Sequence, residues 1–200
     1  YAVLNNDDSR VLNMKLNTKA RVLKYGFDEN STVRISDFKY ISTEENKPMG
    51  VTFNLHTNFS FAPINIYGSL GKSQAYAAAA AAAVGSIFDI NINQISKALK
   101  KYHGPKGRLK IIKGINDSII IDDTYNASPA STQLALETLH DLQASRKIAV
   151  LGDMLELGER SIASHKSIGL ITNSCADILV CVGPLSRLIA EASKIDKDKF

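Results

Sequence analysis

The chain has 200 residues, of which 44% are hydrophobic and 22% charged, and its formal net charge is +4 at pH 7. This composition is typical of a globular protein with a packed core and excludes an intrinsically disordered chain. No run reaches the ~20 apolar residues that span a bilayer, and no signal-peptide pattern surrounds Tyr1.

Residues 1–67 alternate apolar and polar side chains between Asn, Asp, Gly and Pro residues, a pattern typical of antiparallel strands with one wet face. Strands are predicted at residues 21–26, 33–35, 50–55 and 64–67. The stretch Leu4-Asn5-Asn6-Asp7-Asp8 indicates a turn. Because the chain opens without Met in a strand-like pattern, we expect it to be a piece of a longer protein.

Residues 72–103 favour two helices, of which the first is an alanine-rich run that could pack closely on a sheet. The second, at 93–102, places four side chains on one face: Ile95, Ala98, Leu99 and Tyr102. The cluster Gly104-Pro105-Lys106-Gly107 then interrupts the helical pattern. We therefore predict one domain at 1–105 and a second at 106–200.

From Arg108 onward the pattern alternates strands with helices. Strands are predicted at 109–112, 118–121, 147–151 and 178–182, and helices at 131–143, 161–173 and 185–193. The last three strands are nearly continuous apolar runs, so we expect an α/β domain whose parallel sheet is covered on both faces. Only about three βα units fit before Phe200, so this domain is expected to be incomplete.

Polar loops follow two strands of that predicted sheet. The first carries Asp122, Asp123, Tyr125 and Asn126, and the second runs Leu151-Gly152-Asp153-Met154-Leu155-Glu156-Leu157-Gly158. Loops at the carboxyl ends of adjacent strands form the crevice in which open α/β sheets bind ligands. An Asp can also simply cap a turn, and this alternative stays open for the Asp pair.

Two further patterns bear on this region. Ser128 and Pro129 suit the N-cap and the first position of the helix that follows. The segment Gly68-Ser69-Leu70-Gly71-Lys72-Ser73 invites comparison with a phosphate-binding loop, but it has two residues where that loop needs four. It is therefore too short to wrap phosphates.

The charge and cysteine patterns indicate which classes of partner the chain can bind. Basic residues concentrate at 97–113, where Tyr102 is the one nearby aromatic, so the phosphates of a small ligand fit better than a nucleic acid. Cys175 and Cys181 have no metal-ligand spacing with a His and suit free thiols in a reducing cytoplasm. We expect a cytoplasmic protein that binds small molecules, with neither nucleic acid nor a membrane as partner.

The stretches IDDTYNASPAS (121–131), VLGDMLELGE (150–159) and KGR (106–108) together resemble the Mur ligases. Within that family they resemble the MurF-type branch, which adds D-alanyl-D-alanine to UDP-N-acetylmuramoyl-tripeptide. The resemblance implies an α/β fold: the rear part of a central ATPase domain, with antiparallel strands and two helices, then a Rossmann-like C-terminal domain with a mostly parallel sheet. It also implies ATP-dependent amide formation through an acyl phosphate in peptidoglycan precursor synthesis, by a monomer that uses ATP and Mg²⁺.

The resemblance further implies roles for single residues. Asp123 matches the acidic residue that binds the nucleotide ribose, with Asn126 as a second polar contact and Asp122 as a structural neighbour. Arg108 matches an arginine that reaches the ATP phosphates, a task that suits its bidentate fork, whereas the alternative is a solvated arginine in a linker. The resemblance does not fix single roles in the second loop, where Asp153 and Glu156 could face the ammonium group of the incoming dipeptide.

The residues that contact adenine in the family are only partly present in this chain. On the family motif G-x-H-N-x-x-N-A-x-A-A, Ser73, Gln74 and Ala77 stand where His, Asn and Asn are usual. Gln74 keeps an amide for the adenine edge, whereas Ser73 and Ala77 cannot replace the lost contacts. His165 is expected to be a helix-surface or capping residue rather than a base.

Two hypotheses therefore remain. The chain is part of a MurF-type ligase, inactive by itself because the P-loop, the metal ligands and the UDP-sugar site lie outside it. Alternatively, it is a non-catalytic nucleotide-binding or interaction module derived from that fold, which the departures at Ser73 and Ala77 favour slightly. A P-loop encoded in frame upstream of Tyr1 would support the ligase.

Overall fold

The computed structural model describes residues 1–57 and 60–195. The chain forms two compact units. The first comprises Tyr1–Pro105 with Ile111–Ile120, and the second comprises Lys106–Lys110 with Ile121–Phe200.

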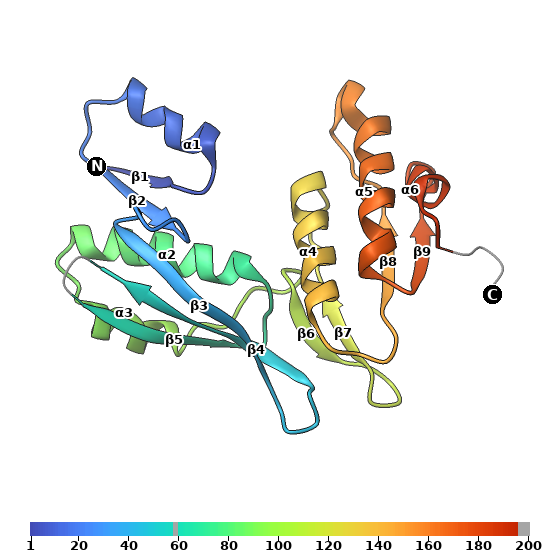
Figure 1. Cartoon of the computed structure of the whole chain (residues 1–200), viewed down its shortest axis with the longest axis horizontal. Coiled ribbons are helices and arrows are strands. Elements are labelled where there is room, and N and C mark those ends of the chain that lie inside the picture. The colour runs from blue at the N-terminus through green and yellow to red at the C-terminus, as the bar shows by residue number, and fades with distance from the viewer. Residues whose placement is uncertain (58–59, 196–200) are drawn as a thin grey trace. The chain divides into compact units, whose positions relative to one another are not determined.

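The first unit is built on a five-stranded sheet in the order β1-β2-β3-β4-β5 (Figure 1). Its strands are β1 (Ala2–Asn5), β2 (Val22–Gly26), β3 (Val33–Ser42), β4 (Pro48–His56) and β5 (Phe61–Tyr67). β3, β4 and β5 pair antiparallel as predicted, whereas β1 pairs parallel to β2 and β2 parallel to β3.

The antiparallel prediction was therefore wrong for the strand at 21–26. Alternation of apolar and polar residues identifies the buried face of a strand, but the connection sets its direction. Between β1 and β2 the chain crosses over through α1 (Ser9–Asn13) and the short 3₁₀ helix η1 (Met14–Asn17), which permits parallel pairing.

The strand predicted at 33–35 continues to Ser42, because a β-bulge interrupts the alternation on which the prediction relied. The register between β3 and β4 shifts after Ser36, where Asp37 takes a φ of 53°. One extra residue moves the following side chains to the opposite face. Phe38 and Tyr40 therefore pack against the same core as the side chains that precede the bulge.

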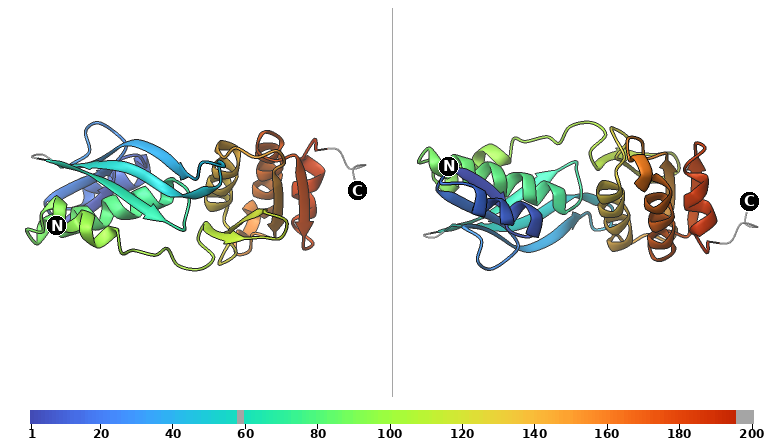
Figure 2. Two further views of the ribbon diagram at one scale, coloured as in Figure 1. Left: turned by 90° about the horizontal axis from the view of Figure 1, so that it is seen from below. Right: turned by 90° about the horizontal axis from the view of Figure 1, so that it is seen from above.

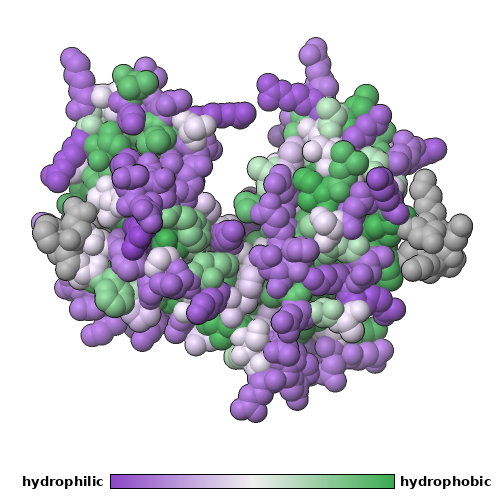
Figure 3. Space-filling view, in the orientation of Figure 1, coloured by the Kyte–Doolittle hydropathy of each residue, from purple (hydrophilic) through white to green (hydrophobic). Residues whose placement is uncertain are grey.

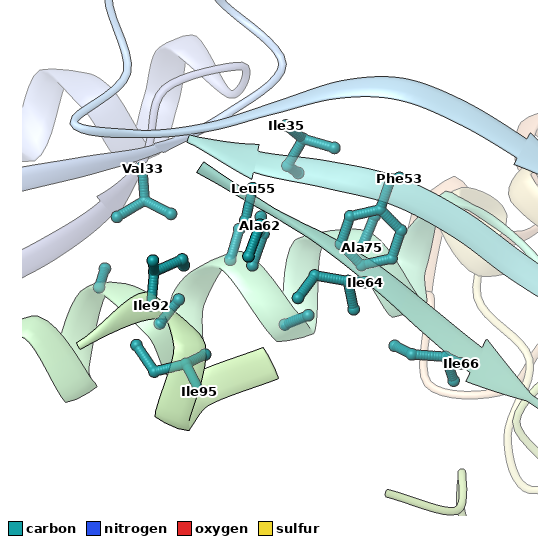
Figure 4. Close-up of a cluster of buried hydrophobic side chains, with 14 of the residues drawn as sticks. Val33, Ile35, Phe53, Leu55, Ala62, Ile64, Ile66, Ala75, Ile92 and Ile95 are labelled. Atoms are coloured by element: carbon teal, nitrogen blue, oxygen red, sulfur yellow. The ribbon is translucent and has the colours of Figure 1, made fainter. Parts of the chain in front are cut away.

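Two helices, α2 (Lys72–Ile87) and α3 (Ile92–Leu99), pack against the hydrophobic face of this sheet (Figure 4). The buried side of α2 is mostly alanine: Ala75, Ala78, Ala79, Ala82 and Ala83. Their spacing of three and four residues puts them on one side of the helix, and their small size lets the helix lie close to the strands.

The helix α3 begins with a capping box between Asn91 and Gln94 and buries Ile92 and Ile95. It ends at Leu99, three residues before the predicted end, and Tyr102 is exposed. The expectation that Tyr102 shares the buried face was therefore wrong, because the helix stops before the Gly104-Pro105 pair.

The turn predicted at Leu4–Asp8 is a hydrogen-bonded junction. The Asp7 carboxylate accepts from the backbone N–H groups of Phe27, at 2.7 Å, and Asp28, at 2.9 Å, and from the hydroxyl of Tyr76 at 2.8 Å. Asp8 caps the N-terminus of α1 through its side chain. The junction thereby joins three segments that are distant in the sequence.

We expect Tyr76→Phe to lower the free energy of unfolding by about 1 kcal/mol, because one donor to a carboxylate is lost while the ring stays in place. That ring packs edge-on against Phe27, with 5.2 Å between centroids. Urea denaturation measures the difference. As a control, Tyr67→Phe should change little, because the Tyr67 hydroxyl has no partner among the described residues. Equal stability of Tyr76→Phe and wild type would contradict the prediction.

The second unit contains the helices α4 (Pro129–Asp141), α5 (Ser161–Cys175) and α6 (Arg187–Ala192). The helix α5 lies between α4 and α6 (Figures 1 and 2). Beside them β8 (Ile148–Gly152) pairs parallel with β9 (Ile178–Val182). The core that these elements share contains Leu136, Met154, Ile168 and Ile189.

The predicted parallel pairing is confirmed for β8 and β9, but the expectation of a third strand and of cover on both faces was wrong for the described residues. β6 (Lys110–Lys113) and β7 (Ile119–Asp122) form a separate two-stranded sheet. In the β8–β9 sheet Ala149 and Leu179 face the core, whereas Val150 and Val182 remain 65% and 61% exposed. An apolar run indicates that a strand can be buried on both faces, but it does not supply the segment that covers the second face.

Some hydrophobic residues are exposed on the surface of both units, where most of the visible residues are hydrophilic (Figure 3). None of the helices in the described ranges has the length and apolar character that a membrane crossing requires.

Candidate functional site

Asp122, at the end of β7, anchors the segment around Gly107. Its Oδ2 accepts from the Gly107 N–H at 3.2 Å, and its Oδ1 accepts from the backbone N–H and the hydroxyl of Thr124 at 3.2 and 2.6 Å. These bonds, led by the Thr124 hydroxyl, hold the pKa of Asp122 below its usual value. Asp122 is therefore an ionised anchor, in line with its predicted structural role.

Asp123 anchors the backbone at Leu109 through one carboxylate oxygen, and its other oxygen can accept hydrogen bonds from a ligand. Its Oδ1 accepts from the Leu109 N–H at 3.0 Å. Within the described residues Oδ2 has no hydrogen-bond or ion-pair partner. Burial raises the pKa of Asp123, although the Leu109 bond and the Arg108 charge act in the opposite direction. A half-buried carboxylate with a free oxygen can accept hydrogen bonds from a ligand with little competition from water.

The backbone between these anchors takes unusual conformations. Gly107 has a φ of 70°, and a Cβ atom there would lie 2.8 Å from the Tyr125 nitrogen. Leu109 is buried and has a φ of 48°, which is uncommon for a large side chain. The segment 107–109 is therefore fixed on both sides of Arg108, and only Gly fits at its start.

Arg108 itself points its cation at an aromatic ring. The guanidinium carbon lies 4.3 Å from the centroid of Tyr125, and the Tyr125 side chain is 72% exposed. Arg108 is also exposed and makes no salt bridge in the part of the chain that the structure describes. Stacking leaves the N–H fork free to pair with an anion such as a phosphate.

Asn126 lies in the same loop but uses its side chain locally. Its Oδ1 accepts from the adjacent Ala127 N–H at 2.9 Å, and the residue is exposed. The predicted start of the next helix is confirmed: Ser128 is the N-cap of α4, in a capping box with Ser131, and Pro129 is its first residue.

The second polar loop follows β8 and leads into the short 3₁₀ helix η2 (Gly158–Arg160). The Asp153 Oδ1 accepts from the Ser186 N–H at 2.6 Å, so this carboxylate anchors the start of α6. Glu156 is exposed, has a φ of 61°, and has no hydrogen-bond or ion-pair partner among the described residues. Of the two predicted acidic residues, Glu156 is the one that remains free to meet a ligand.

The structure brings the two loops to one hydrophobic cluster. Met154 is part of the core that contains Leu136 and Ile168, and Ala127 and Leu157 pack against the same cluster. The end of the Asp122–Asn126 loop and the 153–158 loop therefore share one support. The prediction that they follow adjacent strands was wrong for the described residues, because β7 and β8 belong to different sheets.

His165 is not the surface or capping residue that the sequence indicated. It is fully buried and bonded through both ring nitrogens. A single His in a predicted helix carries no sequence pattern that shows whether its side chain is buried or exposed. The stacking of Arg108 on Tyr125 was also missed, although an aromatic directly after the Asp pair could have suggested it.

Gln74 lies in the first unit, on the first turn of α2, and only 5% of it is exposed. Its Oε1 lies 3.7 Å from the position that a Cβ atom on Gly104 would occupy. The neighbouring Ser69 hydroxyl is buried and has no hydrogen-bond partner in the described part of the chain. Ala77 is exposed one turn further along α2.

No group of three or more His, Cys, Asp or Glu side chains that could hold a metal ion occurs among residues 1–57 and 60–195. The second unit therefore offers a free arginine fork, a carboxylate oxygen and a separate exposed glutamate. This set can bind a polar anionic ligand and an amine.

Comparison with known proteins identifies relatives of this chain. Residues 107–199 match the family described as "Mur ligase, glutamate ligase domain". The UDP-N-acetylmuramoyl-tripeptide–D-alanyl-D-alanine ligase of Bacillus subtilis is 36% identical over 146 residues, which cover 71% of this chain and 31% of the relative. The ligase of the same name from Buchnera aphidicola is 32% identical over 195 residues, covering 96% of this chain and 41% of the relative.

A solved structure agrees with these sequence matches. The crystal structure of MurF from Acinetobacter baumannii superposes with a TM-score of 0.85 at 26% identity, covering 97% of this chain and 41% of that one. The chain thus spans about a third to two fifths of the length of the relatives it matches.

Proposed function

The chain belongs to the Mur ligase family, and from this premise we propose that it is part of an ATP-dependent ligase that adds D-alanyl-D-alanine to UDP-N-acetylmuramoyl-tripeptide in peptidoglycan precursor synthesis. The names of the sequence relatives support this substrate pair. Because the chain spans less than half of those relatives, the activity belongs to the longer protein. Within it, residues 1–105 would form the rear of a central domain and 106–200 the start of a C-terminal domain.

The observation that carries the proposal is the anchoring of Arg108. The carboxylates of Asp122 and Asp123 accept the backbone N–H groups on either side of it, at Gly107 and Leu109. Arg108 therefore presents its guanidinium from a fixed backbone, so little backbone freedom remains to be lost when a phosphate binds. A linker arginine without a role would need no such support.

In this proposal each free group has one task. Asp123 accepts hydrogen bonds from the ribose hydroxyls through Oδ2, and the Arg108 fork pairs with phosphate oxygens. The γ-phosphoryl group of ATP passes to the tripeptide carboxylate with release of ADP. The dipeptide amine, once its ammonium form has lost a proton, attacks the carbonyl carbon of this acyl phosphate and expels inorganic phosphate. Glu156 meets the ammonium form of that dipeptide, while Asp153 anchors the loop. Mg²⁺ would be held by residues outside this chain.

A second candidate function is a nucleotide-binding or interaction module without ligase activity. It is favoured by the burial of Gln74, which leaves little of its amide for an adenine edge, and by the exposed Ala77, which offers no polar group. The two functions differ in one respect that an assay can measure, namely turnover.

We expect the full-length protein to release phosphate from ATP only when both UDP-N-acetylmuramoyl-tripeptide and D-alanyl-D-alanine are present. The 200-residue chain alone should give no product, because it contains no complete phosphate-binding loop and its described residues include no cluster of three or more metal-ligating side chains. A coupled phosphate-release assay with product detection tests both. Binding of ATP without turnover in the full-length protein would favour the module, and ligation by the isolated chain would overturn its assignment as a partial enzyme.

A further inference from the structure

The loop between β8 and α5 holds Glu156 in a backbone conformation that it would not adopt unaided. Glu156 has a φ of 61°, in the left-handed region that favours glycine. A non-glycine residue persists there only when its surroundings hold it. Because the Glu156 side chain itself has no partner among the described residues, the support must come from elsewhere in the loop.

Met154, two residues earlier, is one fixed point of this loop. The Met154 side chain is 1% exposed and lies in the core beside Leu136 and Ile168. Its backbone N–H donates to Nε2 of His165 at 3.0 Å. This hydrogen bond is buried, so water cannot replace His165 as the acceptor at low cost.

The hydrogen bonds also define the protonation state of His165. Nδ1 lies 2.7 Å from the Ser161 carbonyl oxygen, one turn earlier on α5. A carbonyl oxygen can only accept, so Nδ1 carries a proton, and the Met154 N–H can only donate, so Nε2 carries none. The ring is therefore neutral, in its Nδ1–H tautomer, and both of its nitrogens are satisfied.

We propose that His165 is the positioning residue of an amine-recognition loop: its neutral imidazole fixes the Met154 backbone and thereby holds Glu156 where the ammonium group of the incoming dipeptide binds. This inference rests on the proposed function of the 153–158 loop in recognising the acceptor. His165 is buried and does not touch the substrate, so it acts through Met154 and Glu156.

Three variants of the full-length ligase separate this role from general destabilisation. His165→Leu removes the acceptor and should raise the KM for D-alanyl-D-alanine about ten-fold while leaving the KM for ATP unchanged. His165→Gln can place its Oε1 near the former Nε2 and should recover much of that loss. Thr172→Val is the matched control, since Thr172 is also buried on α5 and its hydroxyl donates to the Ile168 carbonyl of its own helix.

A measurement on the unmutated protein keeps the proposal testable even if His165→Leu fails to fold. Nitrogen-15 NMR of the His165 ring should show a protonated Nδ1 and an unprotonated Nε2, and the Met154 amide should exchange slowly with solvent. The opposite tautomer, or a rapidly exchanging Met154 amide, overturns the proposal.

The kinetic outcomes also distinguish the positioning role of His165 from the proposed recognition of the dipeptide by the 153–158 loop. If Glu156→Gln raises the KM for the dipeptide but His165→Leu and His165→Gln do not, the loop recognises the acceptor and His165 does not position it. If Glu156→Gln also leaves that KM unchanged, the loop is not the acceptor site, and both assignments fall. An equal rise with Thr172→Val would show only that α5 had been destabilised, which contradicts a specific role for His165.

Discussion

Replacing Arg108 with alanine in the full-length ligase should lower kcat/KM for ATP by about ten- to a hundred-fold. The change removes charge-assisted hydrogen bonds to phosphate, which contribute roughly 1.5–3 kcal/mol. The fold should be unaffected, because Arg108 is exposed and the anchors from Asp122 and Asp123 reach the neighbouring backbone rather than its side chain. Steady-state kinetics with varied ATP measures the effect.

Two comparisons sharpen that test. Arg108→Lys should recover only part of the loss, because an ammonium group cannot reproduce the planar fork or its stacking on Tyr125. Lys106→Ala removes a nearby exposed cation and should have little effect, which shows whether net charge alone matters. Unchanged kinetics in both Arg108 variants would mean that this arginine is an ordinary exposed residue.

Replacing Asp123 with asparagine should raise the KM for ATP by about ten-fold or more, since a charged acceptor for the ribose hydroxyls is lost, at roughly 1.5–3 kcal/mol. The amide oxygen of Asn can still accept from the Leu109 N–H, so the backbone anchor at 3.0 Å should survive. Asp123→Ala loses both interactions and should also destabilise the protein. The difference between the two variants separates the anchor from the ligand contact.

Asp122→Asn is the matched control for Asp123→Asn. It makes the same chemical change one residue away, on a carboxylate whose oxygens are both occupied by Thr124 and Gly107. Because Asp122 also anchors the backbone beside Arg108, we expect this substitution to lower stability and to raise the KM for ATP less than Asp123→Asn does. Equal effects of the two substitutions on that KM would argue that both carboxylates are structural.

Much of the fold was predictable because local patterns determine it. Seven helices and strands from β6 to α6 lie within a few residues of their predicted positions, and the start of α4 follows from Ser128 and Pro129. What failed depends on contacts between distant segments. The direction of β2 follows from a crossover, and the exposed face of β8 and β9 follows from the segments that do or do not cover it.

The candidate site shows the same division. The resemblance to the Mur ligases suggested Arg108 and Asp123, and Glu156 was a candidate in the second loop. Among the described residues Arg108 makes no salt bridge, and neither Oδ2 of Asp123 nor the Glu156 carboxylate has a partner. The sequence did not suggest that Asp123 also bonds to a backbone group 14 residues earlier. Nor did it suggest that His165 is buried, since that follows from how α5 packs against the preceding loop. Such pairings are set by tertiary structure and leave no periodic trace in a sequence.

The most direct test of the central claim, that this unit binds the nucleotide through Asp123, is the discrimination between ATP and 2′-deoxy-ATP. The ratio of their kcat/KM values should exceed one in the wild type, because the carboxylate loses a hydroxyl partner in the deoxy nucleotide. Asp123→Asn should bring the ratio closer to one, whereas Asp122→Asn should leave it at the wild-type value. The same ratio in wild type and Asp123→Asn would contradict the assignment of Asp123 to the ribose.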